Sequence, residues 1–361
     1  MAAPTTPAGP ATSAAPAPAR SRRSRRAAGL VVGTLALVVA VLASLAVGSR
    51  GIAPGHVLDV LLEPALRFGD PSDPRSVDAV VVLDQRLPRT LLGLAAGIAL
   101  GAAGALMQAL TRNPLADPGV LGITWGASAA IVLGIVGFGV ASVTGYVWFS
   151  LVGSAVVAVV VYLLGQSGRS GATPARLALA GTAIGASLQG IVYAVVLVDQ
   201  RSFDQFRVWR VGSLTGRDPG ALVQVGPILL LGVLLALGVC RSLNALALGE
   251  ETGKALGVRV TRVRAVTGLA IVLLCGGATA VCGPIAFVGL AVPHLARAVT
   301  GPDQRWVVPY SMVLGAVLVV GADVVGRVVA SPAELEVGVV TAFVGAPVFL
   351  AIARRRRVVA L

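Results

Sequence analysis

The chain has 361 residues, of which 56% are hydrophobic and only 12% are charged, and its mean hydropathy is +0.88. This composition excludes an ordinary soluble domain and indicates a polytopic protein of the cell membrane. The formal net charge of +13 would also suit a nucleic-acid-binding protein. The arginines flank apolar runs, however, so we interpret them as anchors that set membrane topology.

Residues 1–26 are rich in Ala, Pro, Ser and Thr and end in SRRSRR, which predicts a disordered, basic cytoplasmic tail. The apolar run 27–48 follows and has about the length that one bilayer requires, so it predicts a first transmembrane helix. A cleaved signal peptide is the alternative, with Ser44 and Ala46 as the small residues before the cut. The apolar run is longer than the hydrophobic region of a usual signal peptide, which favours the helix.

The polar segment 50–85 is broken by prolines and is expected outside the membrane. A second span over 86–110 opens with RLPR, and the proline-rich inner turn 111–119 follows it. Small residues recur along this span at helical spacing, at Gly93, Gly97, Gly101 and Gly104. Such spacing lets two helix backbones approach closely, so it predicts tight packing against another helix.

Eight further apolar runs predict spans, at about 120–139, 146–165, 177–198, 222–240, 266–281, 283–297, 307–325 and 337–353. Both ends of the chain are rich in arginine, so both are expected in the cytoplasm, which requires an even number of spans. The predicted fold is therefore all-α, with about ten transmembrane helices in one membrane domain over 27–357.

The stretch 241–264 reads RSLNALALGEETGKALGVRVTRVR and carries five basic and two acidic residues. This excess of positive charge favours the cytoplasmic face. Glu250 and Glu251 at the start, Lys254 near the end and Gly257 just beyond predict a short helix. A helix of about two turns is marginal alone in water, so it is either part of a solvated loop or a docking element for a cytoplasmic partner.

Residues that would support an enzyme are lacking. His294 follows Pro293 and is interpreted as a polar group at a helix end, and GEETGKA has the wrong spacing for a P-loop, with Ala255 in place of the Ser or Thr that would hold magnesium. We therefore expect no catalytic residue, no metal site and no cofactor in this chain. Asp323 and Arg327 lie one helical turn apart near the outer end of a span and are expected to pair with each other.

Four stretches together resemble the FecCD/BtuC family of ABC-transporter permeases, and they are RLPRTLLGLAAGIALGAAGALMQALTRNPLADPGVLGITWGA, LNALALGEETGKALGVRV, GPIAFVGLAVPHLAR and ELEVGVVTAFVGAPVFLAIARRR. The resemblance covers about 86–357. It implies a ten-helix permease that pairs with a second copy or a related chain, receives ligand from an external binding protein and is driven by cytoplasmic ATPase subunits, which use ATP and Mg. Ferric siderophores are the expected substrate. Haem or cobalamin import is the alternative, and an ion-coupled secondary transporter, for which no coupling-ion site is evident, is the other class.

The resemblance also implies roles for individual residues. It makes 241–264 the coupling region, with ATPase-docking residues Leu246, Leu248, Glu250, Glu251, Lys254, Leu256 and Gly257. It makes Arg86, Arg89 and Arg327 docking residues for the binding protein, whereas pairing with Asp84 or Asp323, or interfacial snorkelling, is the alternative.

Two polar residues inside predicted spans, Gln108 and Gln189, are candidates for lining the translocation pathway, although each could instead form hydrogen bonds between helices. The family's usual Glu-Leu-Pro near the last span is Glu334-Leu335-Glu336 here, which places an added carboxylate at the outer surface.

Overall fold

The computed structural model describes residues 19–48, 50–70, 72–119, 121–140, 142–166, 174–198, 203, 206–207, 209–218, 220–331 and 333–354. These residues form helices and connecting turns, with no β-strand among them. The predicted all-α class is therefore confirmed for this part of the chain.

The elements are, in chain order, α1 (Ala19–Ala46), α2 (Pro54–Leu62), η1 (Pro64–Phe68), α3 (Pro74–Val80), η2 (Val81–Arg86), α4 (Leu87–Thr111), α5 (Ile123–Phe138), α6 (Val143–Gln166), α7 (Pro174–Val198), α9 (Gly220–Ala247), α10 (Glu250–Ala255), α11 (Val260–Ile271), η3 (Val272–Gly276), α12 (Gly277–Cys282), α13 (Val288–Thr300), α14 (Gln304–Val329) and α15 (Val337–Arg354). The segments η2 and η3 are π-helical turns that join their neighbours into long continuous helices.

Helix α1 begins at Ala19, inside the segment 1–26 that was predicted to be a disordered tail. No proline follows Pro18 until Pro54, and alanine and arginine favour helix, so the helix extends from the first span back through the arginine cluster. Residues 1–18 lie outside the described residues.

The expected number of about ten spans is not reproduced by helix length. Within the described residues, seven helices are long and apolar enough to cross a membrane, and they are Ser24–Ala46, Pro74–Thr111, Gly145–Gly165, Arg176–Val198, Gly220–Ala247, Val260–Cys282 and Gln304–Val329. Two further apolar helices, Ile123–Phe138 and Val337–Val348, are shorter. The predicted span 283–297 corresponds to α13, which has only 13 residues.

The short helices have a local cause. The chain between α4 and α5 does not stay at the surface, because Ala116 and Leu121 in this turn are buried. Helix α5 therefore starts only at Ile123, already inside the molecule. Helix α13 likewise starts late, at Val288, after the extended segment that Gly283 opens with a positive φ of 72°.

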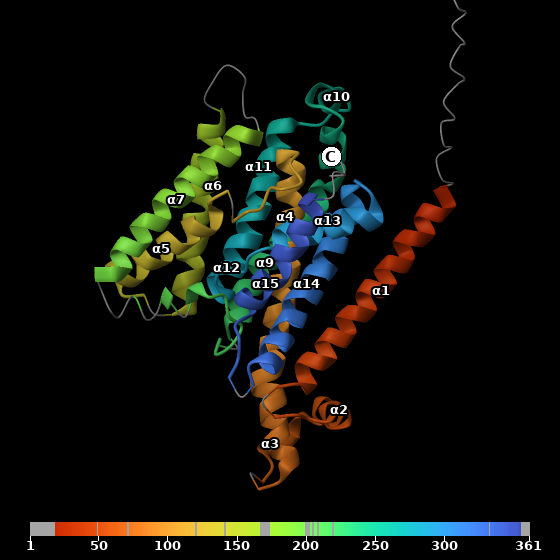
Figure 1. Ribbon diagram of the computed structural model, residues 1–361, viewed down its shortest axis with the longest axis vertical. Coiled ribbons are helices and arrows are strands. Elements are labelled where there is room, and N and C mark those ends of the chain that lie inside the picture. The colour runs from red at the N-terminus through yellow and green to blue at the C-terminus, as the bar shows by residue number, and fades with distance from the viewer. Residues whose placement is uncertain are drawn as a thin grey trace, which may run out of the picture.

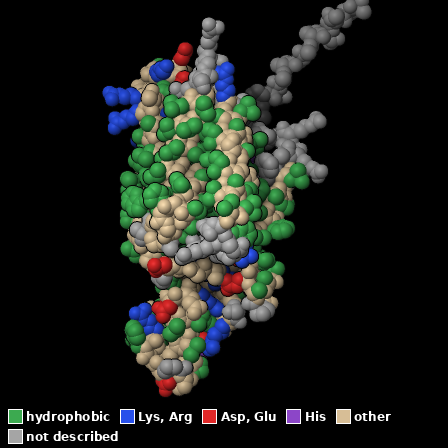
Figure 2. Space-filling model, turned by 90° about the vertical axis from the view of Figure 1, so that its left-hand side faces the viewer, with side chains coloured by type: hydrophobic (Ala, Val, Ile, Leu, Met, Phe, Trp, Pro, Cys, Tyr) green, Lys and Arg blue, Asp and Glu red, His purple; other side chains and the backbone are tan. Residues whose placement is uncertain are grey.

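Figure 1 shows α10 at one end of the molecule and α2 and α3 at the opposite end, which we call the α10 end and the α3 end. The N-terminal end of α1 and the C-terminal end of α15 both lie toward the α10 end (Figure 1). A belt of hydrophobic side chains separates the two ends, and Lys and Arg side chains lie at both of them, beside Asp and Glu at the α3 end (Figure 2).

Helices α4 and α14 form the most extensively packed pair among the described elements. A Cβ on Gly101 would lie 2.0 Å from the Ser311 carbonyl oxygen, and one on Gly97 would lie 2.5 Å from the Ala316 Cα atom. Both contacts are shorter than any real carbon contact, so only glycine fits there. The tight packing that the glycine spacing of 86–110 predicts is confirmed.

Candidate functional site

The three arginines predicted to share one outer surface do converge. Arg86, Arg89 and Arg327 line a cavity of about 360 Å³ near the α3 end, which we call the outer arginine cavity. Arg217, in the loop before α9, lines it as well and was missed from the sequence. A basic residue between two predicted spans was the only available signal, because nothing in the local pattern places Arg217 near α4.

Asp323 on α14 binds two of these arginines. Its Oδ1 atom lies 2.7 Å from Arg89 Nη2, and its Oδ2 atom accepts hydrogen bonds from Arg327. Asp323 is only 2% exposed. The expected pairing of Asp323 with Arg327 is therefore confirmed, and this pair extends to Arg89 on α4.

The same cluster ties α1 and the loop before α15 to α4 and α14. Arg327 donates to the Ser44 carbonyl oxygen at 2.8 Å and to Ser44 Oγ at 2.9 Å. Arg89 Nη1 lies 2.7 Å from Glu334 Oε2. Burial raises the pKa of Glu334, but the hydrogen bond and the charge of Arg89 outweigh that effect and hold this pKa below its ordinary value of 4.5.

Arg86 and Arg217 differ from the other two arginines, because no carboxylate oxygen of the described residues lies within salt-bridge distance of either. Arg86 donates to the backbone carbonyls of Leu45 and Arg50. Arg217 donates to the Ser213 carbonyl oxygen at 3.1 Å, its Nη2 atom is buried without a hydrogen bond, and burial lowers its pKa. The alternative partner Asp84 pairs with Arg67 instead, at 3.5 Å.

At the opposite end, α10 forms a short exposed turn of helix where it was predicted. Gly249 and Gly257 flank it with positive φ values of 117° and 82°. Both values are accessible to glycine and rare for other residues, so the two glycines allow the sharp turns that make α10 project.

The predicted docking residues of α10 separate into two groups. Leu248 is 68% exposed and Leu256 is 62% exposed, and Glu251 and Lys254 are exposed beside them. Leu246 was expected on the same surface but is buried, since it packs beneath Gly253 and holds α10 onto the end of α9.

Glu250 also has an internal partner, because it forms an ion pair with Arg264 on α11. The surface that α10 presents therefore consists mainly of two leucines with charged neighbours.

The two intramembrane glutamines also differ. Gln108 is completely buried, accepts a hydrogen bond from Arg297 and donates to the carbonyl oxygens of Gly289 and Leu290 at 3.2 Å. It thus joins α4 to α13 by hydrogen bonds, as the alternative role predicts. Gln189 on α7 is half-buried, and Ser187 and Gly190 beside it are exposed.

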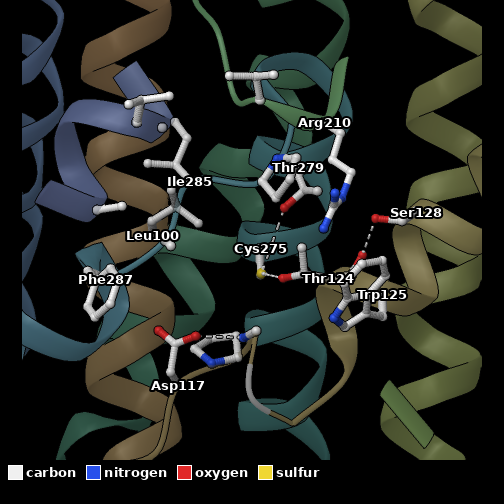
Figure 3. Close-up of a pocket in the computed structure, with 18 of the residues that line it drawn as sticks. Leu100, Asp117, Thr124, Trp125, Ser128, Arg210, Cys275, Thr279, Ile285 and Phe287 are labelled. Carbon is white, nitrogen blue, oxygen red and sulfur yellow. Dashed lines mark hydrogen bonds between the residues drawn. The ribbon is translucent and has the colours of Figure 1, made fainter. Parts of the chain in front are cut away.

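A larger cavity, of about 970 Å³, was not foreseen from the sequence. It is lined by α5, α7 and α15, by the segments before α9 and before α13, and by single residues of α4, η3 and α12. Figure 3 shows Arg210 at one side of this central cavity, near Trp125, and Asp117 at the opposite side. The side chains that line it are mainly apolar or aromatic, among them Leu100, Phe206, Ile285, Phe287 and Phe343.

Two named permease proteins are similar in sequence to most of the chain. It is 45% identical to the ferric enterobactin transport system permease protein of Escherichia coli over 323 residues, which are 89% of this chain and 93% of the relative. It is 42% identical to a probable siderophore transport system permease protein of Bacillus subtilis, over 76% of this chain and 83% of the relative.

The fold matches a solved structure as well. A metal-chelate type ABC transporter in an inward-facing conformation superposes with a TM-score of 0.76 at 26% identity, covering 91% of this chain and 99% of that one. The model of the FecCD transport family matches residues 36–355. On this evidence, the chain belongs to the FecCD transport family.

Proposed function

We propose that this chain is the membrane-spanning permease subunit of an ATP-driven importer of ferric siderophores. The observation that carries the proposal is the 45% identity to a ferric enterobactin permease over 89% of the chain. An apolar belt between two polar ends and a central cavity support a transport role (Figure 2). In this proposal the shorter helices α5, α13 and α15 also lie at membrane depth, which makes ten helices.

The α10 end faces the cytoplasm in this proposal. Exposed basic residues gather there, including Lys254, Arg259 and Arg262, and the N-terminal end of α1 and the C-terminal end of α15 lie toward it. Positive charge favours the cytoplasmic side. A separate ATPase subunit, which uses ATP and Mg, docks on α10 through Leu248 and Leu256, because two exposed leucines with charged neighbours suit a groove with a polar rim.

The outer arginine cavity receives carboxylates of an external binding protein. Arg86 and Arg217 are the cations best suited to this role, because neither has a carboxylate partner among the described residues. Arg89 contributes at the rim of the cavity, where its Nη1 atom is already paired with Glu334. Arg327 supports the site from within, since its contacts are internal.

The docking proposal is tested by reversing charge at Arg86 and Arg89 together. The Arg86→Glu, Arg89→Glu permease is expected to associate more slowly with the loaded binding protein, with a weaker salt dependence. Arg25→Glu, an exposed reversal at the α10 end, is the matched control. Unchanged association kinetics in the double variant would assign these arginines a purely structural role.

A second permease subunit, the same chain or a related one, covers the exposed face of α7. Thr182, Ser187 and Gly190 lie exposed on this helix. Small and polar residues are typical of surfaces where membrane helices meet or where a pathway is lined. Pairing at this face would enclose a pathway beside Gln189.

The substrate is tested by uptake in a strain that lacks this gene. Labelled ferric siderophores, haem and cobalamin are supplied in turn, and only ferric siderophore uptake is expected to fail and to be restored by the chain. Loss of haem uptake instead would favour the alternative substrate, since the chain is also 38% identical to a hemin transport permease of Yersinia pestis over 76% of its length.

A further inference from the structure

Arg210 lies in the central cavity against two aromatic rings from different helices. Its Cζ atom is 5.2 Å from the ring centre of Trp125 on α5 and 4.9 Å from that of Tyr193 on α7. The two rings meet edge to face, with their centres 6.3 Å apart. Cation–π contacts of this kind fix a guanidinium plane without using its N–H donors.

The charge of Arg210 is not neutralised within the described part of the chain. No carboxylate there lies within salt-bridge distance of it. Figure 3 shows its side chain directed into the cavity, so its donors face the space that a ligand would fill. Arg207, from the same segment, lines this cavity as well.

The remainder of the cavity suits a large ligand with flat, apolar parts. Its volume of about 970 Å³ is at the upper end of the usual range for ligand sites. Phe206, Phe287 and Phe343 add aromatic surface to the lining. Asp117 stands at the far side from Arg210 (Figure 3), so the cavity is positive at one side and carries a carboxylate at the other.

We propose that Arg210, Trp125 and Tyr193 form a recognition subsite for an anionic metal chelate that carries aromatic rings. The guanidinium donates hydrogen bonds to phenolate or carboxylate oxygens of the chelate, and the indole and phenol rings stack on its aromatic groups. Charge-assisted hydrogen bonds are stronger than neutral ones, so the subsite discriminates against neutral chelates. This proposal rests on the proposed function and narrows its substrate class.

A structural role for Arg210 makes a different prediction. If it served only to hold its segment against α5 and α7, removing its charge would weaken the binding of every ligand alike. A recognition role predicts a loss that depends on the charge of the ligand. The experiment therefore compares chelates of the same metal that differ in charge and in aromatic character.

The test measures equilibrium binding of radiolabelled ferric chelates to the intact permease complex in lipid nanodiscs. The probes are a ferric tris-catecholate, which is anionic and aromatic, ferric citrate, which is anionic without rings, and a neutral ferric trihydroxamate. Arg210→Gln is expected to lose about tenfold in affinity for both anionic chelates and nothing for the neutral one. Trp125→Leu is expected to weaken the tris-catecholate more than ferric citrate, because it removes a stacking surface as well as one of the two rings that hold Arg210.

Two further variants serve as a conservative substitution and as a control. Arg210→Lys keeps the charge but loses the planar fork and is expected to fall between wild type and Arg210→Gln. Arg75→Gln removes an exposed charge of α3, away from the cavity, and is expected to bind like wild type. If Arg210→Gln does not assemble, wild type still decides the question, because equal or tighter binding of the neutral chelate would overturn the proposal.

The proposal is also overturned if Arg210→Gln binds the tris-catecholate with wild-type affinity, or loses affinity equally for all three chelates. Uptake by the complete transporter separates this outcome from a failure of the proposed function. A wild-type transporter that carries no ferric chelate contradicts the permease assignment itself. Normal uptake with an unchanged chelate preference in Arg210→Gln contradicts only the subsite.

Discussion

At the scale of single residues, Asp323 has the largest predicted effect on stability, because its buried carboxylate faces both Arg89 and Arg327. Asp323→Asn would leave two largely buried guanidinium groups without that charge. Removing one partner of a buried ion pair costs about 3 kcal/mol or more, so a marked fall in the thermal unfolding midpoint is expected in detergent or nanodiscs.

The matched control is Asp59→Asn, which changes the same group at an exposed position of α2 and is expected to leave the midpoint unchanged. Equal midpoints for Asp323→Asn and wild type would show that the cluster contributes little to stability.

Glu334 predicts a pH dependence whose sign follows from its lowered pKa. A carboxyl group with a lower pKa in the folded state stabilises the fold above its unfolded pKa, here 4.5, and loses that contribution as the pH falls through the folded value. Glu334→Gln should therefore melt below wild type at neutral pH, and the difference should close under acid conditions. A difference that stays constant at all pH values would contradict the Arg89 contact as its source.

Sequence separation decides which of these contacts could be foreseen. Asp323 and Arg327 lie four positions apart on one helix, so their pairing follows from helical geometry. Arg89 lies 234 positions from Asp323 and 245 from Glu334. No local pattern reports such contacts, because they depend on which helices pack together.

At the scale of elements, the proposed docking role of α10 predicts that a substitution on this helix can uncouple transport from ATP hydrolysis. Leu256→Asp places a charge on the exposed docking surface of α10, so ATP hydrolysis by the assembled transporter should continue while substrate uptake falls. The two rates are measured together in proteoliposomes. Leu256 is 62% exposed, so the permease itself should remain folded. Wild-type uptake in this variant would remove α10 from the coupling pathway.

Leu246, ten positions earlier in the chain and near the end of α9, provides the contrasting substitution. It is buried beneath Gly253, so Leu246→Asp should reduce the yield of folded permease rather than uncouple it. Size-exclusion profiles of the two aspartate variants distinguish these effects.

The contact between α4 and α14 predicts that one methyl group is enough to disturb the core. Gly101→Ala would place Cβ 2.0 Å from a backbone oxygen of α14, which forces the helices apart and costs roughly 1–3 kcal/mol or more. Gly238→Ala on α9 meets nothing within 4 Å and should be neutral or slightly stabilising, since alanine favours helix. Thermal unfolding of the two variants checks the contrast, and a stable Gly101→Ala would contradict the close packing.

The apolar runs in the sequence predicted the positions of the helices well, but they predicted the lengths of the helices less well. Hydropathy reports that a segment is apolar, but it does not report the depth at which the helix begins. The turn before α5 enters the molecule through buried Ala116 and Leu121, so α5 needs fewer residues than a full span. The glycine spacing of α4, in contrast, was informative because it reflects a contact between two regular helices.

At the scale of the whole molecule, the two glutamines predict opposite accessibility from a water-filled pathway. In the assembled transporter, Gln189→Cys should react with a membrane-impermeant thiol reagent in at least one transport state, whereas Gln108→Cys should stay protected. The wild-type protein is the control, because Cys240, Cys275 and Cys282 are all buried. Complete protection of Gln189→Cys in every state would place the pathway elsewhere.

The central cavity could not be predicted from the sequence of this chain alone. Its walls come from α4, α5, α7, η3, α12 and α15 and from two connecting segments, and each contributes only a few residues with no common motif. Trp125 and Tyr193 appear in their own helices as ordinary apolar positions. Only their meeting around Arg210 gives them a shared chemical environment.

The continuous helix from Pro74 to Thr111 has a steric consequence. Its 38 residues span about 57 Å at the usual rise of an α-helix, whereas the hydrocarbon core of a bilayer is about 30 Å thick. One end must therefore stand well clear of the lipid, and Figure 1 shows α3 projecting beyond the other helices. The outer arginine cavity lies at the base of this projection, since Val81 and Gln85 line it. A partner protein with a flat surface would contact the tip of α3 before it reached the arginines. A protein that binds these arginines therefore needs a recess that accommodates α3.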